Sequence, residues 1–427
     1  MKISPARTAA FDILLRIERD GAFSSILLPQ YESELEKNDR ALCHEIVLGV
    51  LRRQMYLDRV LETFIGNRRL DLEVRVAMRI GLFQIFYLDR IPAFSAVNES
   101  VNLIGRAKKS SAKGLVNAVL RKAVSSTPDI AYADDIERIS VENSHPQWLI
   151  ERWIDEFSPE DAEKIAESNN KQPPLVFRGT AKTDSLDLSS LGRPLDGTAR
   201  AYIANGLGTS LREAAANHQV YFQDAGSQMV AEAANPGRGE SFLDVCASPG
   251  SKTTYIAAFL QSALIVAGEV SAARVRLLRE NCREQGADFV NVCRYDALQP
   301  LPFAEASFDV VLVDAPCTGT GTIRHNPEIR YFLKPADFSE LSLKQLAILM
   351  NASKVVRKSG RLIYSTCSLE IEENERVVER FGTGNPEFSI VRPNVQDRFI
   401  TKEGFARTFP HRDGFDGFFI AEFRRSV

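Results

Sequence analysis

Strand-like runs alternate with helical segments from Tyr221 to the C-terminus, and this alternation constrains the fold more than any other feature. The runs "SFLDVC", "ALIVAGE", "FVNVCRYD", "FDVVLVDAP" and "GRLIYSTCS" are apolar, and each ends in a short polar loop. Segments with helical spacing separate them, at 253–260, 272–285, 338–356 and 373–381. The pattern predicts a doubly wound α/β sheet of parallel strands that binds ligands at the carboxyl ends of its strands. Residues 385–427 are expected to add antiparallel edge strands.

The rest of the chain has a different character. Apolar residues recur at helical spacing through residues 5–125, as in "ALCHEIVLGVLRRQMYLDRVLETFI". A polar, acidic stretch at 126–143 is typical of a linker, and 175–220 holds short apolar runs cut by "GRPLDGTAR" and "ANGLGTS". A chain of 427 residues exceeds one ordinary core. We therefore expect a helical domain at 1–130, a small α+β module at 143–220 and the α/β domain at 221–427.

Composition excludes several classes of protein. The chain is 44% hydrophobic and 26% charged, with no apolar run near the ~20 residues of a membrane span. Its six cysteines, at 43, 246, 282, 293, 317 and 367, include no C-x-x-C pair. That spacing argues against a zinc site and a disulfide framework, and for a reducing cytoplasm. The expected protein is a cytoplasmic monomer without metal or membrane partner.

Charge offers one local signal for nucleic acid. The net charge of −3 gives no overall signature, so any nucleic-acid binding must rest on patches. Residues 101–125 carry no acid and six bases: Arg106, Lys108, Lys109, Lys113, Arg121 and Lys122. A surface that faces phosphates and an ordinary solvated helix face explain this stretch about equally well.

The first strand–turn–helix, "FLDVCASPGSKTTYIAAFL", limits the cofactor. A Walker loop fails because Cys246 and Ser251 stand where both glycines belong, and a dinucleotide turn fails because Gly250 is its single glycine. S-adenosylmethionine remains: Asp244 and the small residues 247–250 suit its cationic sulfonium and amino-acid end. Glu269 lies where an acid can accept the ribose hydroxyls. Asp296 can meet the adenine amino group.

Two cysteines follow the next two strands, in Asp314-Ala-Pro-Cys317 and Ser365-Thr-Cys367-Ser. Neighbouring strands of such a sheet bring both thiols to one cleft. Thiols in such a cleft suit the methylation of carbon 5 of cytosine, which accepts a methyl group only after a thiolate has added at carbon 6. The covalent adduct divides one hard step into easier ones. Asp314 is suited to stabilise the charge at N3, and the second cysteine is a candidate helper in release. The residues alone leave open which thiol attacks.

Motifs along nearly the whole chain carry a family resemblance. They are "GVLRR", "RIGLFQIFYLDRIP" and "KGLVNAVLRK" in the helical part, "HPQWLIERW" and "NNKQPP" in the module, and "QDAGSQ", "DVCASPGSKTT", "DAPCTGTGTIRHNPEIRY", "YSTCSLEIEENE" and "DGFDGFF" in the α/β domain. With these motifs the chain resembles the Sun/Fmu (RsmB-type) ribosomal RNA cytosine-C5 methyltransferases of the Nol/Nop/Sun family. The resemblance implies an all-α NusB-like RNA-binding domain, an α+β module and a Rossmann-like class I methyltransferase domain.

The resemblance also implies roles for single residues. Cys367 would be the nucleophile and Cys317 would assist product release, with Asp314 and Lys252 in the active site. S-adenosylmethionine would be held by Cys246, Ala247, Ser248, Pro249, Gly250, Ser251, Lys252, Glu269, Asp296 and Asp314. Three features depart from the family pattern: G-S-K replaces G-G-K at Ser251, Glu269 replaces an aspartate, and "LVFRGTAK" replaces the usual L-R-x-N.

Substrate contacts follow the same resemblance. Ribosomal RNA, of the small-subunit 16S kind, is the implied partner. The place of Arg324, Arg330, Lys334 and Arg412 beside the reactive loop or near the C-terminus favours contacts to phosphates, with Tyr331 stacking on an extruded base. His411 lies next to Arg412, and without the partner spacing of a metal ligand it is better explained as a loop hydrogen-bonder. Two alternatives stay open: transfer RNA as the substrate, and a non-catalytic RNA-binding assembly factor. A DNA cytosine methyltransferase would attack with the P-C cysteine and would not need T-C-S.

Overall fold

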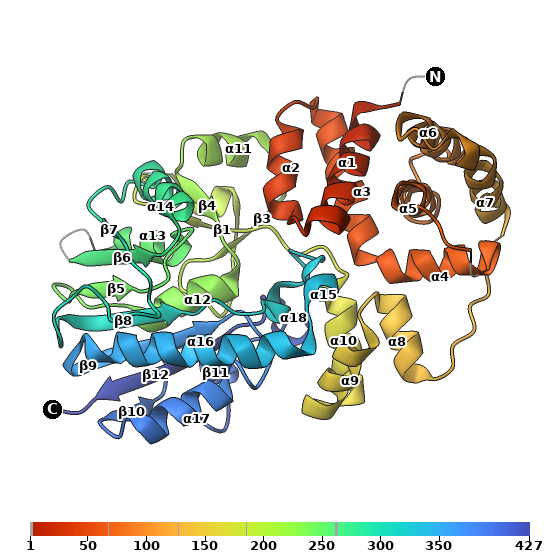
Figure 1. The fold of residues 1–427 in the computed structure, drawn as a ribbon. Helices are drawn as coiled ribbons and strands as arrows, with labels where there is room; N and C mark the ends of the chain where they lie inside the picture. The colour runs from red at the N-terminus through yellow and green to blue at the C-terminus, as the bar shows by residue number, and fades with distance from the viewer. Residues whose placement is uncertain (1–2, 67, 127, 185, 261–263) are drawn as a thin grey trace. The chain divides into compact units, whose positions relative to one another are not determined.

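The computed structural model describes residues 3–66, 68–126, 128–184, 186–260 and 264–427 (Figure 1). Its chain forms two compact units. The first contains the residues up to Gln172 together with Ile323–Phe332, and the second contains Pro173–Thr322 and Leu333–Val427. The segment Ile323–Phe332, which follows the Asp314–Cys317 motif, therefore belongs to the helical unit.

The first unit is all helical. Its helices are α1 (Pro5–Asp20), α2 (Ser24–Glu32), α3 (Lys37–Arg52), α4 (Gln54–Ile65), α5 (Leu72–Tyr87), α6 (Ala93–Arg106), α7 (Lys113–Ser125), α8 (Asp135–Asn143), α9 (Gln147–Glu156), α10 (Pro159–Asn169) and α15 (Ile329–Phe332). Helix α5 contacts α1, α3, α4, α6 and α7 and is apolar on most of its surface, as a central helix must be. Gly81 permits its close approach to α7, because a Cβ there would lie 2.6 Å from a Leu120 methyl carbon.

The second unit holds two sheets. The smaller is antiparallel, in the order β2 (Gly192–Pro194), β3 (Tyr202–Ala204), β1 (Val176–Gly179), β4 (Val220–Phe222), with α11 (Thr209–Ala216) beside β4. The larger runs β10 (Phe388–Val391), β12 (Phe419–Arg425), β9 (Val356–Thr366), β8 (Phe308–Asp314), β5 (Phe242–Asp244), β6 (Ile265–Glu269), β7 (Asn291–Arg294), and β11 (Ala406–Arg407) pairs with β12. Strands β5 to β9 are parallel, while β10, β11 and β12 add antiparallel pairs at one side. The predicted fold class, edge strands included, is confirmed.

Helices cover both faces of the larger sheet. Phe242 packs in the same cluster as residues of α12 (Ala225–Ala234), α13 (Ser251–Ala257) and α14 (Ala272–Glu284). Leu243, the next residue of β5, packs with α16 (Pro335–Lys354) and α17 (Glu375–Gly384) instead. Successive strand residues point to opposite faces, so the apolar β5 run serves both layers. Among the described helices, none is long and apolar enough to cross a membrane.

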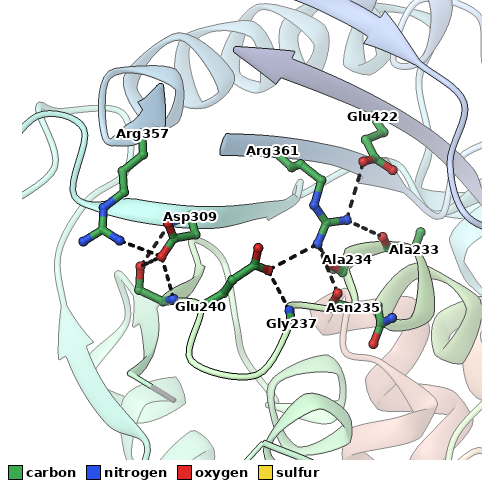
Figure 2. A network of polar contacts seen from close by, with 10 residues as sticks. Ala233, Ala234, Asn235, Gly237, Glu240, Asp309, Arg357, Arg361 and Glu422 are labelled. Carbon is green, nitrogen blue, oxygen red and sulfur yellow. Dashed lines mark hydrogen bonds and ion pairs between the residues drawn. The ribbon is translucent and has the colours of Figure 1, made fainter. Parts of the chain in front are cut away.

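Arg361 fastens α12 to the sheet. Its guanidinium donates to the carbonyls of Ala234 (2.8 Å) and Asn235 (3.1 Å) at the end of α12, and it faces Glu422 of β12 (Figure 2). A cationic side chain at this place satisfies carbonyls that the helix leaves without an intrahelical donor. Beside it, Asp309 of β8 accepts hydrogen bonds from Ser241 and pairs with Arg357 (Figure 2). These contacts fix the strands whose opposite ends carry the candidate site.

Candidate active site

Strands β5 and β8 form the point at which the strand order of the larger sheet reverses. The chain proceeds from β5 to β6 and β7 on one side, then returns to β8 and β9 on the other. Ligands of open α/β sheets bind outside the carboxyl ends of strands at such a point. Asp244 ends β5 and Asp314 ends β8, two register positions further along, so both acids lie at this edge.

Buried Lys252 and half-buried Asp314 form an ion pair at this edge. The Nζ atom of Lys252 lies 2.6 Å from Asp314 Oδ2, and Ser365 Oγ donates to Asp314 Oδ1 at 2.8 Å. Burial disfavours the charge on Lys252, but the Asp314 carboxylate outweighs it, so the pKa of Lys252 rises above its usual value. The structure thus brings a charged amine and a carboxylate together beside the cysteine-bearing loops.

The two predicted cysteines meet. Their Sγ atoms lie 3.3 Å apart, and both are free thiols. The hydrogen bond to Cys367, and then burial, raise the pKa of Cys317 well above that of an ordinary thiol. Asp314 adds to the same shift through its charge. These surroundings therefore disfavour a thiolate at Cys317.

The turn after β5 requires a glycine at position 250, both for its backbone conformation and for its close approach to α14. Gly250 has a φ of 104°, and a Cβ there would lie 2.7 Å from a Leu278 methyl carbon. Ser251 is the first residue of α13 and has no positive φ, so the G-S-K departure places no strain on a side chain. The positions from Cys246 to Lys252 form this turn and the start of α13.

Asp244 is the acid best placed to meet a cationic ligand group. Thr253 Oγ1 donates to its Oδ2 at 2.7 Å, whereas Oδ1 is buried and has no hydrogen-bond partner in the described part of the chain. Burial raises the pKa of Asp244 to about 7. A buried acceptor without a donor is costly, so an amino group brought by a ligand would satisfy it. The carboxylate oxygens of Asp244 fit the amino group at the amino-acid end of S-adenosylmethionine.

The two remaining acids lie at neighbouring strand ends. Glu269 is the last residue of β6, is buried, and accepts a hydrogen bond from the backbone nitrogen of Ser271 at 2.8 Å. Asp296 follows β7, is exposed, and accepts from the backbone nitrogen of Leu298 at 3.0 Å. Strands β6 and β7 pair in parallel up to Glu269 and Arg294. Their carboxyl ends can thus present both acids to one nucleoside.

Arg178 is a positioning residue that the sequence did not reveal. It lies on β1, in the divergent "LVFRGTAK" run, and is 1% exposed. Its guanidinium donates to the carbonyl of Ser251 (2.9 Å), to Thr254 Oγ1 (2.9 Å) and to Gln223 Oε1 (2.6 Å). Through Arg178, strand β1 therefore holds the first turn of α13 in place. An apolar, strand-like run containing a single arginine was the available signal, but it does not tell a buried arginine from an exposed one.

The structure contradicts the expected role of Arg330 as a phosphate contact. Its side chain is fully buried inside the first unit. It donates to the carbonyls of Asn143 (3.0 Å) and Asn169 (3.3 Å) and to Asn170 Oδ1 (2.9 Å). Burial lowers the pKa of this guanidinium to about 10. Arg330 is an internal anchor, because the segment that follows the catalytic loop folds into the helical unit.

The neighbours of Arg330 are engaged in the same unit. The hydroxyl of Tyr331 lies 2.7 Å from the carbonyl oxygen of Leu51, so its polar end is not free to contact RNA. Arg324 is buried, contrary to the expected grip on a phosphate, and its carbonyl accepts from Arg52 Nη2 at 3.0 Å. Lys334 is exposed and remains a candidate, whereas the exposed Arg412 pairs with Asp413 at 3.0 Å.

The basic stretch at 101–125 is only partly available. Arg106 forms a two-point ion pair with Asp12 (2.6 and 2.7 Å), and Lys109 pairs with Asp71 at 2.8 Å. Lys108, Lys113 and Arg121 have no ion pair with any described residue. Acids from other helices thus neutralise part of a stretch that carries none itself.

A second basic cluster lies between α4 and α5. Arg68, Arg69 and Arg75 line a hollow of about 470 Å³ and form no ion pair within the described residues. The acids of this hollow are engaged elsewhere, since Asp58 pairs with Arg79 and Glu62 with Arg59. In the sequence this cluster is visible only as the dipeptide Arg68-Arg69. The third arginine, Arg75, joins it through the folding of α5 against the same hollow.

Family models match the chain in three places. The model described as 16S rRNA methyltransferase RsmB/F matches residues 231–424. The NusB family model matches 4–125, and a ferredoxin-like domain of RsmF/B-like methyltransferases matches 145–184.

Curated relatives and solved structures agree with these matches. The chain is 32% identical to a probable ribosomal RNA small subunit methyltransferase B of Bacillus subtilis (strain 168), over 100% of both chains. It is 33% identical to a protein of the same name from Synechocystis sp., over 99% of both. The crystal structure of PH0851 superposes over 100% of both chains with a TM-score of 0.82 at 24% identity. That of NSun6 from Pyrococcus horikoshii with SFG covers 66% of this chain and 98% of its own, with a TM-score of 0.57 at 20% identity.

Proposed function

This chain belongs to the RsmB/F family of 16S rRNA methyltransferases, and from that premise we propose that it methylates carbon 5 of a cytosine in small-subunit ribosomal RNA. The observation that carries the finer assignment is the pair of free thiols 3.3 Å apart, beside the Lys252–Asp314 ion pair. Carbon 5 of a pyrimidine such as cytosine is a methyl acceptor whose chemistry needs a thiol nucleophile. A methyltransferase acting on an amine or a hydroxyl would need neither cysteine.

The surroundings of the thiols support a division of labour between them. The hydrogen bond to Cys367, and then burial, raise the pKa of Cys317, which disfavours a thiolate at Cys317. A thiolate is the nucleophile and a neutral thiol is not. Cys367 faces the charge of Lys252, which contributes to the raised pKa of that amine. We therefore assign the attack on carbon 6 to Cys367.

The proposed reaction passes through a covalent adduct between Cys367 and the base, and residues of this chain carry its proton transfers. Cys367 forms a bond from Sγ to carbon 6, and the displaced electron pair moves onto N3, where the Lys252–Asp314 pair supplies the proton. S-adenosylmethionine, when bound, supplies the electrophilic methyl group that carbon 5 takes up. Once Cys367 is bonded to carbon 6, its hydrogen bond and charge no longer raise the pKa of Cys317, so Cys317 loses its proton to solvent and then accepts the proton from carbon 5. N3 then returns its proton to the Lys252–Asp314 pair, the bond between carbon 6 and Cys367 breaks, and Cys367 leaves as the thiolate.

The RNA partner is proposed to bind the helical unit through its free arginines and lysines. Arg68, Arg69 and Arg75, with Lys108, Lys113 and Arg121, are among the cations of this unit that pair with no described acid. Counterion release upon contact with phosphates gives such residues their affinity for RNA.

A direct test uses the full-length protein with small-subunit ribosomal RNA from a strain that lacks the corresponding gene. Bisulfite sequencing after incubation with S-adenosylmethionine should reveal one newly protected cytosine. Naked 16S RNA, small-subunit particles and bulk transfer RNA are compared in parallel. Methylation of transfer RNA alone would refute the substrate, and methyl transfer without bisulfite protection would refute the C5 position. Binding without any transfer would favour an assembly factor.

A further inference from the structure

Glu373 lies close to both cysteine-bearing loops and accepts hydrogen bonds from each of them. Its Oε1 accepts hydrogen bonds from the backbone nitrogen of Thr318 (3.0 Å) and from Gln345 Nε2 (2.9 Å). Its Oε2 accepts from the hydroxyls of Thr318 and Ser368. Thr318 directly follows Cys317, and Ser368 directly follows Cys367. One carboxylate therefore joins the residues next to the two thiols.

The backbone alone fixes these loops weakly. The parallel β8–β9 ladder ends at Asp314 and Ser365, before either cysteine. Beyond it, the described backbone hydrogen bonds between the loops are Ala315 N to Ser365 O (2.8 Å) and Gly321 N to Cys367 O (2.9 Å). The separation of the two sulfur atoms is therefore set largely by side chains.

The charge of Glu373 is costly where it lies. The side chain is fully buried, and burial raises its pKa above the usual value. Among the described residues no arginine or lysine pairs with it. Four hydrogen bonds donated to one carboxylate match the acceptor capacity of the ionised form. An apolar residue would fill such a place at lower cost to stability, so the carboxylate is better explained by the geometry it imposes.

We propose that Glu373 is a positioning residue that holds Cys317 and Cys367 at the separation their joint chemistry requires. The inference rests on the proposed function for its catalytic meaning. The geometric part stands apart from it, because thiol proximity can be measured without RNA or cofactor. Glu373 touches neither reacting sulfur and acts through Thr318 and Ser368.

The first experiment measures the proximity itself. Diamide oxidises two adjacent thiols to a disulfide and is reduced to the hydrazine, taking up two electrons and two protons. The rate of Cys317–Cys367 disulfide formation is followed by mass spectrometry after alkylation of the remaining thiols. Glu373→Gln keeps the shape and removes the charge, while Glu373→Asp keeps the charge and shortens the reach. The matched control is Glu372→Gln, because the neighbouring Glu372 pairs with Arg376 in α17.

Both Glu373 variants should form the disulfide about tenfold more slowly than the wild type, and the control should match the wild type. Alkylation of Cys293 serves as the internal reference, so that general loosening of the fold is recognised. Unchanged disulfide rates in Glu373→Asp and Glu373→Gln would overturn the proposal. If Glu373→Asp fails to fold, the isosteric Glu373→Gln alone decides.

Methyl transfer then tests the catalytic meaning. In Glu373→Gln, kcat should fall about tenfold while KM for RNA and for S-adenosylmethionine stays unchanged, and covalent RNA adduct should persist longer. A merely structural role would raise KM or lower stability without prolonging the adduct. Slower disulfide formation with unchanged methylation would overturn the proposal that this separation serves catalysis. If even the wild type fails to methylate RNA, the proposed function fails, and the disulfide rates still decide the geometry.

Discussion

The Sγ atoms of Cys317 and Cys367 lie 3.3 Å apart, although fifty residues separate them along the chain. The contact follows from sheet topology, because β8 and β9 are parallel neighbours whose carboxyl ends meet at one edge. The same contact, together with burial, raises the pKa of Cys317 and disfavours its thiolate. We therefore expect the removal of Cys317 and the removal of Cys367 to have different effects.

Replacing Cys367 by alanine should abolish methylation. Cys317 is the thiol next to Cys367, and its raised pKa leaves it a poor nucleophile; burial raises the pKa of Cys246, in the turn after β5, as well. Methyl incorporation into ribosomal RNA, with RNA binding as the control for folding, measures the effect. Turnover near that of the wild type would show that Cys367 does not attack the base.

Cys317→Ala should instead trap the reaction. The nucleophile remains, but the step that frees it from the methylated base is slowed, so a covalent protein–RNA adduct should accumulate. Denaturing gel electrophoresis reveals the adduct as a shifted band. Complete loss of activity without any adduct would assign the attack to Cys317 instead.

Asp244→Asn should stabilise the protein in a manner that depends on pH. The pKa of Asp244 is raised to about 7 in the folded chain, chiefly by burial, and lies near 4 in an unfolded one. Between these values the folded chain holds a proton that the unfolded chain has released, so this group costs stability as pH rises and adds no further cost above about 7. Asparagine has no ionisable side chain, so the substitution removes this dependence of stability on pH.

The stability gain of Asp244→Asn should therefore grow by about 1.4 kcal/mol per pH unit between pH ~5 and ~7 and then level off. Urea unfolding of both proteins across this range measures it. The same variant should bind S-adenosylmethionine more weakly, because the buried acceptor for its amino group is altered. A gain that is independent of pH would show that Asp244 is ionised throughout.

Arg178→Met should weaken both the fold and the cofactor site. The substitution leaves the carbonyl of Ser251 and the side chains of Thr254 and Gln223 without their buried donor, which costs about 3 kcal/mol. We expect a lower melting temperature and an increase of about tenfold in the Kd for S-adenosylmethionine. The exposed Arg193→Met in the same module is the control. Equal effects of the two variants would remove the special role of Arg178.

Arg68→Ala with Arg69→Ala should weaken RNA binding and reduce its dependence on salt. Each phosphate that the protein no longer neutralises should lower the slope of log K against log salt by about 0.7 to 0.9. Arg106→Ala is the comparison, because Asp12 already neutralises Arg106 and its removal should change the slope little. Binding is measured by filter retention at several salt concentrations. An unchanged slope in the double variant would make this cluster a solvated surface.

Sequence periodicity determined much of the architecture. The alternation after Tyr221 predicted the doubly wound sheet, and four expected helices correspond to α13, α14, α16 and α17 within a few residues. Strand-end motifs supplied the site residues because a parallel sheet gathers the carboxyl ends of its strands at one edge. Asp314, Lys252, Cys317 and Cys367 are brought together there. Their roles stay predictions.

The sequence by itself thus determined the sheet and its edge residues, since local periodicity and strand order suffice for both. Only the tertiary structure decided which charged side chains are buried. Arg330 follows a reactive loop in the sequence and still lies inside the helical unit, while Arg178 sits in an unremarkable run and supports the cofactor turn. A charged residue is satisfied by partners distant in sequence, such as Asn143 for Arg330 or the loops of both cysteines for Glu373. Periodicity does not report those partners, because they depend on how separate elements pack.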